Sequence, residues 1–407
     1  MQTRVCNGRA SSVRKFLGRL YHADYTPTKP LTLPSRHTSL FPLLNSYNNL
    51  VLPRTPWRSP SETPYTIGTR TPEGDVVEEE IVVPFVLSQY SGDDPDSRAI
   101  GYLRRPVAEA IEEDHQKHIV SGYASPWDLR YSRNRHGIPK GIKSVAFAPW
   151  VNEGGKYTRT MHIERLVLDW RKHGMFPEVL KSWSDQAYPA FTHPPKHGTA
   201  GHEPLAFAIE RAALTLFGLM NFGALLIAYT RHPTTGLMYL WIPRRSKTKR
   251  SWAGKLDVTI AGGLSLGASA LPTILSESAE EALLDTEFVS QHIRPVGVLP
   301  SLLRSPLGYP LPGMYFLFDL PLPPDGSVMP RRNVLDGGHE VDNFELIDVQ
   351  SVLEHLLDNE FKPSSGLAIA DFLVRHGYVT EETDPRYLEV CRLLKMDIEL
   401  PLAWRGH

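Results

Sequence analysis

The stretch AGGLSLGASALPTILSESAEEALLDTEF, residues 261–288, carries more information about fold and chemistry than any other part of the sequence. It opens with Gly262 and Gly263, and glycine permits tight turns and a close approach of the backbone to a neighbouring group. A helix is predicted to begin near Leu271, because Ser269 is suited to capping its first turn. The pattern therefore predicts a glycine-rich turn that leads directly into a helix.

The predicted helix carries three glutamates, Glu277, Glu280 and Glu281, at a spacing that places all of them on one face. Like charges at this spacing destabilise an isolated helix by roughly 0.2–0.5 kcal/mol per pair. No lysine or arginine lies between Leu256 and Ile293 to offset the repulsion locally. A hard divalent cation would offset it, since Mg²⁺ takes oxygen ligands and is commonly held by carboxylates together with substrate phosphates. A solvated acidic face is the other interpretation of the same spacing.

Composition limits the class of protein. The 407 residues allow two or three domains, and a chain that is 41% hydrophobic and 22% charged is typical of soluble globular proteins. Lysine and arginine total 44 against 45 acidic residues, and the resulting net charge of -1 argues against a nucleic-acid polymer as partner. The two cysteines, Cys6 and Cys391, exclude a disulfide framework and favour a reducing compartment.

Two stretches bear on location. Residues 1–23 are rich in arginine and contain no acid, which is the pattern of a mitochondrial targeting segment; a basic tail on a cytoplasmic protein is the simpler expectation. Residues 212–230 carry no charge and are long enough to span a bilayer. Because glycines and an asparagine interrupt them, we expect a helix over 205–217, a turn and a core strand over 224–229 in place of a membrane span.

The remaining sequence shows mixed helix and strand signals and no internal repeat. Residues 24–80 are rich in Pro, Ser and Thr and are expected to be mostly irregular. Apolar periodicity predicts helices over residues 106–117, 162–172, 349–359, 367–376 and 385–394. Short apolar runs predict strands over residues 238–242, 257–261, 293–299, 315–320 and 344–347.

The 261–288 stretch resembles the Nudix box, whose pattern is G-x5-E-x7-R-E-U-x-E-E-x-G-U with U a bulky aliphatic residue. Set at Gly262, the pattern places its helix glutamates on Glu277, Glu280 and Glu281. The flanks are similar to fungal and plant Nudix proteins related to thiamine pyrophosphokinase, which carry a characteristic domain ahead of the box. The pieces that carry this similarity include IERAALTLFG (209–218), LWIPRRSKTKRSW (240–252), HEVDNFEL (339–346) and FKPSSGLAIADFLVRHGYVTEE (361–382).

The resemblance implies an α+β fold in which a Nudix-type α/β/α sandwich with a mixed sheet follows a smaller α+β domain. The implied division is an irregular extension over 1–80, a family-specific α+β domain over 81–200, the Nudix domain over 201–360 and C-terminal helices packed on it over 361–407. Some relatives carry a kinase domain after the Nudix part, and none is expected here. Synthesis of thiamine diphosphate is therefore not expected either.

The resemblance also implies metal-dependent hydrolysis. Glu277, Glu280 and Glu281 would bind Mg²⁺ or Mn²⁺, and Glu280 and Glu281 would take part in catalysis. Glu340 is a candidate for a further metal ligand or a general base, and an exposed acid at a strand end is the other interpretation. The expected location is cytoplasmic, with a mitochondrial alternative through residues 1–23.

The implied partner is a small-molecule diphosphate, with no membrane. Thiamine diphosphate or its oxo and oxy forms would give the monophosphate, and 8-oxo-dGDP is a second candidate. The backbone at Gly262 and Gly263 would lie against the phosphates, and Arg245 or Lys249 would hold a phosphate unless their segment is simply a solvated basic loop. Aromatic residues that could stack on the substrate ring are Trp241, Trp252, Tyr309 and Tyr315.

The sequence departs from the family pattern inside the box. Ala268 stands at the first glutamate, Ser276 at the arginine, Ser278 at an aliphatic position and Leu283 at the late glycine. Losing groups that orient a metal shell typically costs 10- to 100-fold in affinity or activity. These changes support an alternative, a catalytically weakened ligand-binding or regulatory protein with the Nudix shape. Outside the box, the residues that differ from the family are Leu225, Ile227, Val258 and Gly313.

Overall fold

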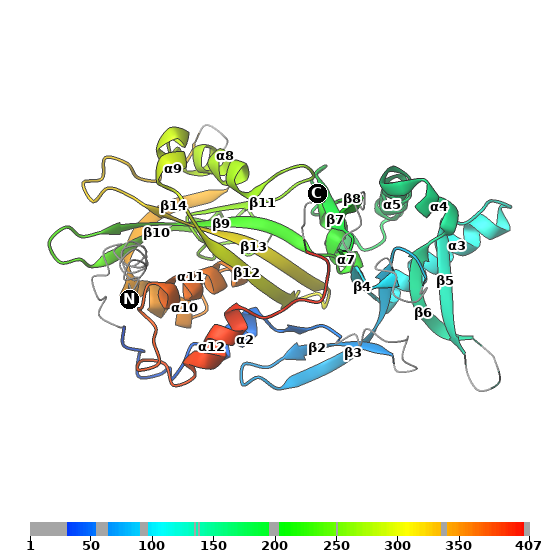
Figure 1. Cartoon of the computed structure of the whole chain (residues 1–407), viewed down its shortest axis with the longest axis horizontal. Coiled ribbons are helices and arrows are strands. Elements are labelled where there is room, and N and C mark those ends of the chain that lie inside the picture. The colour runs from blue at the N-terminus through cyan, green and yellow to red at the C-terminus, as the bar shows by residue number, and fades with distance from the viewer. Residues whose placement is uncertain are drawn as a thin grey trace, which may run out of the picture.

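The computed structural model describes residues 31–53, 64–89, 97–133, 136, 139–194, 203–249, 251–334 and 340–402. Within these ranges the chain forms two six-stranded sheets and one two-stranded sheet, each associated with helices (Figure 1). The targeting candidate, residues 1–23, lies outside the described residues. No helix in the described part of the chain has both the length and the apolar character that crossing a membrane requires.

The sheet that follows residue 220 is mixed. Its strand order is β12-β13-β9-β10-β14, and β11 pairs with β9. Strands β13 and β9 are parallel, and the other pairs are antiparallel. The strands are β9 (Asn221–Arg231), β10 (Met238–Arg245), β11 (Ile260–Gly263), β12 (Arg294–Arg304), β13 (Pro310–Pro321) and β14 (Val341–Asp348). Each strand predicted in this region is present, although β11 begins three residues later than expected.

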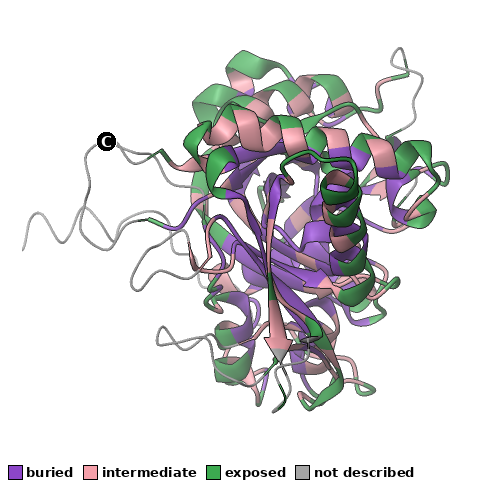
Figure 2. Ribbon diagram, turned by 90° about the vertical axis from the view of Figure 1, so that its right-hand side faces the viewer, coloured by how far each residue is buried: buried purple, intermediate pink, exposed green. Residues whose placement is uncertain are grey.

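Helices cover both faces of this sheet. Along β9, Ala224, Leu226 and Ala228 pack in one core with α8 (Ala270–Ala282) and α9 (Thr286–His292). The alternate residues Leu225, Ile227 and Tyr229 pack in another core with α10 (Val349–Leu357), α11 (Pro363–Arg375) and α12 (Tyr387–Leu394). Successive strand side chains point to opposite faces, so a sheet covered on both sides needs such an uninterrupted apolar run. The expected α+β fold with an α/β/α sandwich is confirmed, and Figure 2 shows the buried strands between helices with exposed outer faces.

The second six-stranded sheet lies in the part of the chain before the box. Its order is β1-β2-β3-β6-β5, and β4 pairs with β3. The strands are β1 (Leu50–Val51), β2 (Tyr65–Arg70), β3 (Val76–Val86), β4 (Gly101–Arg104), β5 (Trp127–Arg133) and β6 (Pro139–Phe147). Its helices are α3 (Arg105–Val120), α4 (Pro149–Glu153), α5 (Gly155–Lys172) and α6 (Pro177–Leu180).

Helix α5 shows how the sequence forms this second unit. Ile163, Leu166, Val167 and Trp170 recur at helical spacing, and all four are buried. The ring of Trp170 stacks on Phe217 with 5.9 Å between the ring centroids. Apolar periodicity therefore predicted the face that this helix buries, although α5 begins at Gly155, seven residues before the expected start.

A two-stranded sheet joins the two units, and here one expectation was wrong. Strand β7 (Ala187–Phe191) pairs with β8 (Leu205–Glu210), so the first half of the helix expected over 205–217 is a strand. Only η2 (Arg211–Ala213) and α7 (Leu214–Phe217) are helical. The error has a physical reason, because a short run of consecutive apolar residues fits a buried strand and a buried helix equally well.

The expected irregular extension over 1–80 also needs correction in its described part. Helix α2 (Phe41–Tyr47) buries Phe41, Leu44 and Tyr47 in the core that contains the C-terminal helices. Strands β2 and β3 then pair as an antiparallel hairpin. The abundance of proline concealed these elements, since composition alone does not show which apolar residues find a distant partner.

Candidate functional site

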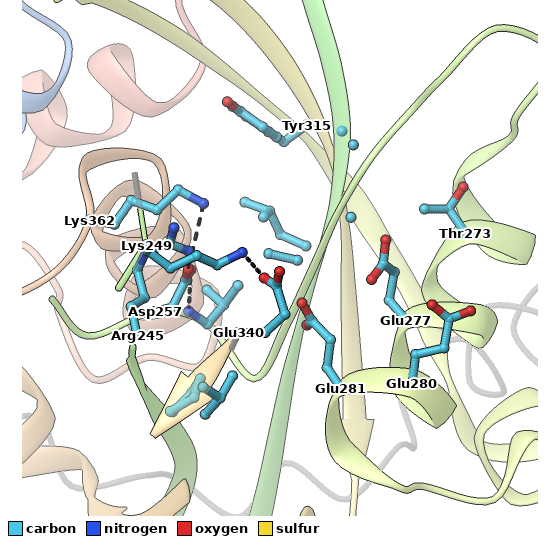
Figure 3. A pocket seen from close by; sticks show the side chains of 18 of the residues that line it. Arg245, Lys249, Asp257, Thr273, Glu277, Glu280, Glu281, Tyr315, Glu340 and Lys362 are labelled. Atoms are coloured by element: carbon cyan, nitrogen blue, oxygen red, sulfur yellow. Dashed lines mark hydrogen bonds and ion pairs between the residues drawn. The ribbon is translucent and has the colours of Figure 1, made fainter. Parts of the chain in front are cut away.

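A cavity of about 620 Å³ lies between β11, α8 and the chain after β10. All eight residues predicted to form the site line it: Gly262, Gly263, Arg245, Lys249, Glu277, Glu280, Glu281 and Glu340. Figure 3 shows the three glutamates projecting from α8, and Arg245, Lys249, Asp257 and Lys362 grouped together on other segments. The structure thus brings the predicted residues together, and their roles stay predictions.

Helix α8 presents its glutamates to the cavity because its other face is held on the sheet. Ile274, Ser278 and Ala282 recur at spacings of four residues and are buried. Glu277 and Glu281 are also four residues apart, on the cavity side. Ser278 occupies the family's aliphatic position, and its hydroxyl is buried with no hydrogen-bond partner in the described part of the chain.

Gly262 allows the helix to approach β11 closely. A Cβ atom at this position would lie 2.6 Å from the Thr273 Cγ2 atom and 2.9 Å from the Glu277 Cγ atom. Neither distance is compatible with ordinary van der Waals contact. Glycine at 262 is therefore required for the position of Glu277, whatever ligand the cavity takes.

Two glutamates on the acidic side of the cavity have unfavourable electrostatic surroundings. Burial, followed by the charges of Glu277 and Asp257, raises the pKa of Glu281 to about 8. Burial, followed by the charge of Glu280, raises the pKa of Glu277. The exposed Glu280 instead accepts a 2.5 Å hydrogen bond from the hydroxyl of Ser276, the residue at the family's arginine position. The carboxylates of Glu277 and Glu281 therefore lack sufficient positive charge around them.

The basic side is organised by a buried acid, Asp257. Its carboxylate binds Arg245 at 2.7 Å, lies 3.6 Å from the Lys362 ammonium and accepts a hydrogen bond from the Ser365 hydroxyl. Burial opposes ionisation of Asp257, but Lys362 and Arg245 outweigh it and lower its pKa. A separate ion pair joins Lys249 to Glu340. Asp257 therefore holds two cations at the cavity.

Asp257 and Lys362 were not among the site residues predicted from the sequence. Both lie within segments that show the family resemblance, but neither belongs to a cluster of chemically active residues along the chain. Asp257 precedes β11, and Lys362 immediately precedes α11, about a hundred residues later. Pairing of the backbone between Leu256 and Phe361 brings the two segments together.

Whether the cavity suits a metal ion depends on the oxygen ligands that its glutamates offer. In the part of the chain that the structure describes, no group of three His, Cys, Asp or Glu side chains is arranged to hold a metal ion. Glu277 and Glu281 fit a hard cation by donor type, and a bound cation would offset the burial and the neighbouring acids that raise their pKa values. Glu280 fits less well, because its carboxylate is bound to Ser276.

The aromatic candidates divide into two pairs. Trp252 and Tyr315 line the cavity, whereas Trp241 packs in the core beneath α8 and Tyr309 lies under Arg104. Of these four candidates, Trp252 and Tyr315 are therefore the two placed to contact a ligand ring.

Three of the departures from the family pattern are core residues. Leu225, Ile227 and Val258 are each at most 3% exposed and belong to the core with the C-terminal helices. Ala268 lies in the loop before α8, and Leu283 ends the helix with a left-handed φ of 53°. A glycine would adopt that last conformation without the cost that leucine bears.

About half of the chain is similar in sequence to known proteins. An uncharacterised Saccharomyces cerevisiae protein, YJR142W, is 33% identical over 203 residues, which are 47% of this chain and 58% of that protein. Nudix hydrolase 24, chloroplastic, of Arabidopsis thaliana is 36% identical over 193 residues, 47% of this chain and 50% of the relative. The chain thus spans little more than half the length of these curated relatives, and no family model matches it.

Among solved structures, the NUDIX domain of Shewanella oneidensis NrtR, complexed with ADP ribose, is similar at 13% identity. The alignment covers 39% of this chain and 90% of that domain, with a TM-score of 0.29. About half of this chain is thus similar to about half of each of two Arabidopsis thaliana proteins, Nudix hydrolase 24 and Nudix hydrolase 20.

Proposed function

We propose that the protein is a metal-dependent hydrolase that cleaves the diphosphate of a small molecule. One observation carries the proposal: α8 presents Glu277 and Glu281 to a cavity that also contains the cations Arg245, Lys249 and Lys362. Acidic groups suit a divalent ion, and cations beside them suit phosphate oxygens. Such a combination is suited to a substrate that arrives as a complex of metal and diphosphate.

The cations of the cavity bind and orient the phosphates. Arg245 is held in place by Asp257, so its guanidinium is ordered before the substrate arrives. Lys249 is bound to Glu340, whose side chain is 51% exposed. A phosphate that takes Lys249 as its partner frees the Glu340 carboxylate, which then accepts a proton from the attacking water.

The acidic residues would hold the metal. Glu277 and Glu281, with Glu280 after rotation away from Ser276, would bind Mg²⁺ or Mn²⁺, which supplies charge neutralisation and a more acidic water when bound. Gly262 keeps α8 against β11 and so fixes where these carboxylates lie. Positioning of this kind decides whether bound water and phosphorus meet in a reactive geometry.

The proposed substrates are thiamine diphosphate, its oxo and oxy forms, and 8-oxo-dGDP. The family resemblance supports the thiamine compounds, and Trp252 and Tyr315 offer aromatic surface to a substrate ring. Hydrolysis would give the monophosphate and inorganic phosphate. The proposed location is cytoplasmic, with mitochondrial import through residues 1–23 as the alternative.

A second candidate function is binding without efficient turnover. The hydrogen bond between Ser276 and Glu280 favours it, because it turns one of the three glutamates away from the ligand role. Ala268 contributes as well, since it offers no carboxylate. In this case the cavity would still take a diphosphate ligand.

The test is metal-dependent phosphate release from thiamine diphosphate, its oxo and oxy forms and 8-oxo-dGDP, together with chromatographic detection of AMP formed from ADP-ribose. We expect turnover that requires Mg²⁺ or Mn²⁺ and falls at least 100-fold in Glu281→Gln. Glu354→Gln is the matched control, because Glu354 is exposed on α10 and does not line the cavity. Absence of turnover by the folded wild-type chain on every compound would favour the binding protein over the hydrolase.

A further inference from the structure

The part of the chain before the box forms one wall of the cavity. The backbone N–H of Leu266, in the loop between β11 and α8, donates to the Ala187 carbonyl of β7 at 2.8 Å. Tyr188, the next residue of β7, is 4% exposed and packs against Gly263, where a Cβ atom would lie 2.1 Å from the tyrosine hydroxyl oxygen. The β7–β8 hairpin is therefore packed directly against the glycine-rich loop of the box.

This hairpin places Arg211 at the cavity. Arg211 follows β8 directly, and its backbone N–H donates to the Gln186 carbonyl at 2.9 Å. Its guanidinium lies 3.5 Å from the Gln186 side-chain oxygen and 5.9 Å from the centre of the Tyr188 ring. Gln186, Tyr188 and Arg211 all line the cavity.

The charge of Arg211 is available to a ligand. Its side chain is exposed, and it forms no ion pair with a carboxylate in the described part of the chain. Arg245 and Lys362, by contrast, share Asp257, and Lys249 is bound to Glu340. An arginine at the edge of a cavity that also contains three glutamates is suited to an incoming anion, since its planar fork binds phosphate oxygens in pairs.

Asn221 adds a second, independent observation on the same side of the cavity. It begins β9 and pairs in register with Gly313 of β13. Its side-chain oxygen is buried and has no hydrogen-bond partner among the described residues, although the residue lines the cavity. A buried acceptor without a partner is costly, and a ligand that donates a hydrogen bond removes that cost.

We propose that Arg211 binds a phosphate of the substrate and that Asn221 accepts a hydrogen bond from the same molecule. The inference rests on the proposed function and adds to it a substrate-binding wall formed by Gln186, Tyr188, Arg211 and Asn221. Arg211 touches the substrate before and during the reaction alike, so it contributes to binding and not to the chemical step. The region before the box is then part of the site and not only a packing partner.

Steady-state kinetics on the best substrate of the panel separates binding from chemistry. We expect Arg211→Gln to raise KM about 10- to 100-fold with kcat within threefold of wild type, as the loss of one charged hydrogen-bonding group predicts. Arg211→Lys keeps the charge without the planar fork, so its KM should lie between those of the wild type and Arg211→Gln. Arg130→Gln is the matched control, because Arg130 is exposed on β5 and does not line the cavity.

Calorimetric titration of the full chain with methylene diphosphonate and Mg²⁺ tests the same contact without turnover. Weaker binding by at least tenfold in Arg211→Gln, with Arg130→Gln unchanged, supports the inference even if the wild type hydrolyses nothing. Unchanged KM and unchanged probe affinity in a folded Arg211→Gln overturn it, and the hydrolase proposal then stands on its own assay. A wild-type chain that neither binds the probe nor turns over any substrate overturns both proposals.

Discussion

Replacing Gly262 by alanine tests the architecture of the site in its most crowded place. The new Cβ atom would lie 2.6 Å from the Thr273 Cγ2 atom, 2.9 Å from the Glu277 Cγ atom and 3.1 Å from the Glu277 Oε1 atom. Favourable carbon–carbon contacts begin near 3.5 Å, so α8 must move from β11 by roughly 0.6–0.9 Å. Overpacking of this kind typically costs about 1–3 kcal/mol of folding free energy.

The same displacement should affect function more than stability. A misplacement of about 1 Å in a reactive assembly costs on the order of 100-fold in rate. The double variant Gly262→Ala, Thr273→Ser removes the nearest clashing atom, so it should recover part of the stability while Glu277 stays displaced. Recovery of stability without recovery of turnover would show that the position of Glu277 is the sensitive quantity.

Urea unfolding measures the stability change, and phosphate release measures the rate. Gly141→Ala is the control, because a Cβ atom there meets nothing within 4 Å and its φ is not in the left-handed region. Wild-type stability in Gly262→Ala would refute the close approach of α8 to β11 that the structure shows, irrespective of what the protein hydrolyses.

Two other predictions concern stability alone. Leu283 has a φ of 53° and a half-exposed side chain. Leu283→Gly should therefore raise the free energy of unfolding by about 1 kcal/mol, as measured by urea titration. A lower free energy of unfolding in this variant would contradict the strain assigned to this helix end. His193 is buried and its Nε2 atom lies 2.9 Å from the Ala99 carbonyl oxygen; burial lowers its pKa from 6.5 to about 4. Because the unfolded chain binds the proton first, stability should fall by up to about 2 kcal/mol as the pH drops from 7 to 5. His193→Gln should reduce that pH dependence, and an unaltered dependence would show that His193 is not its source.

Local sequence patterns predicted the elements that form from interactions between residues close together in the chain. The apolar faces of α5 and α8 follow from helical spacing, and so does the common face of Glu277 and Glu281. Strand β8 was mistaken for helix, because the consecutive apolar residues 206–209 carry no periodicity that separates the two. The hairpin β2–β3 was missed for a related reason, since its stability comes from strands that lie far along the chain.

The sequence by itself determined that three carboxylates share a helix face after a glycine-rich turn, because residues three and four apart in a helix are neighbours whatever surrounds them. The sequence also has glycine at position 262, but it does not show that Thr273 and Glu277 leave no room for a Cβ atom there. Only the tertiary structure decided that Asp257, Lys362 and Arg211 meet those carboxylates at one cavity. Pairing of β13 with β9 and of Leu256 with Phe361 joins segments far apart in the chain, and no local spacing encodes such contacts.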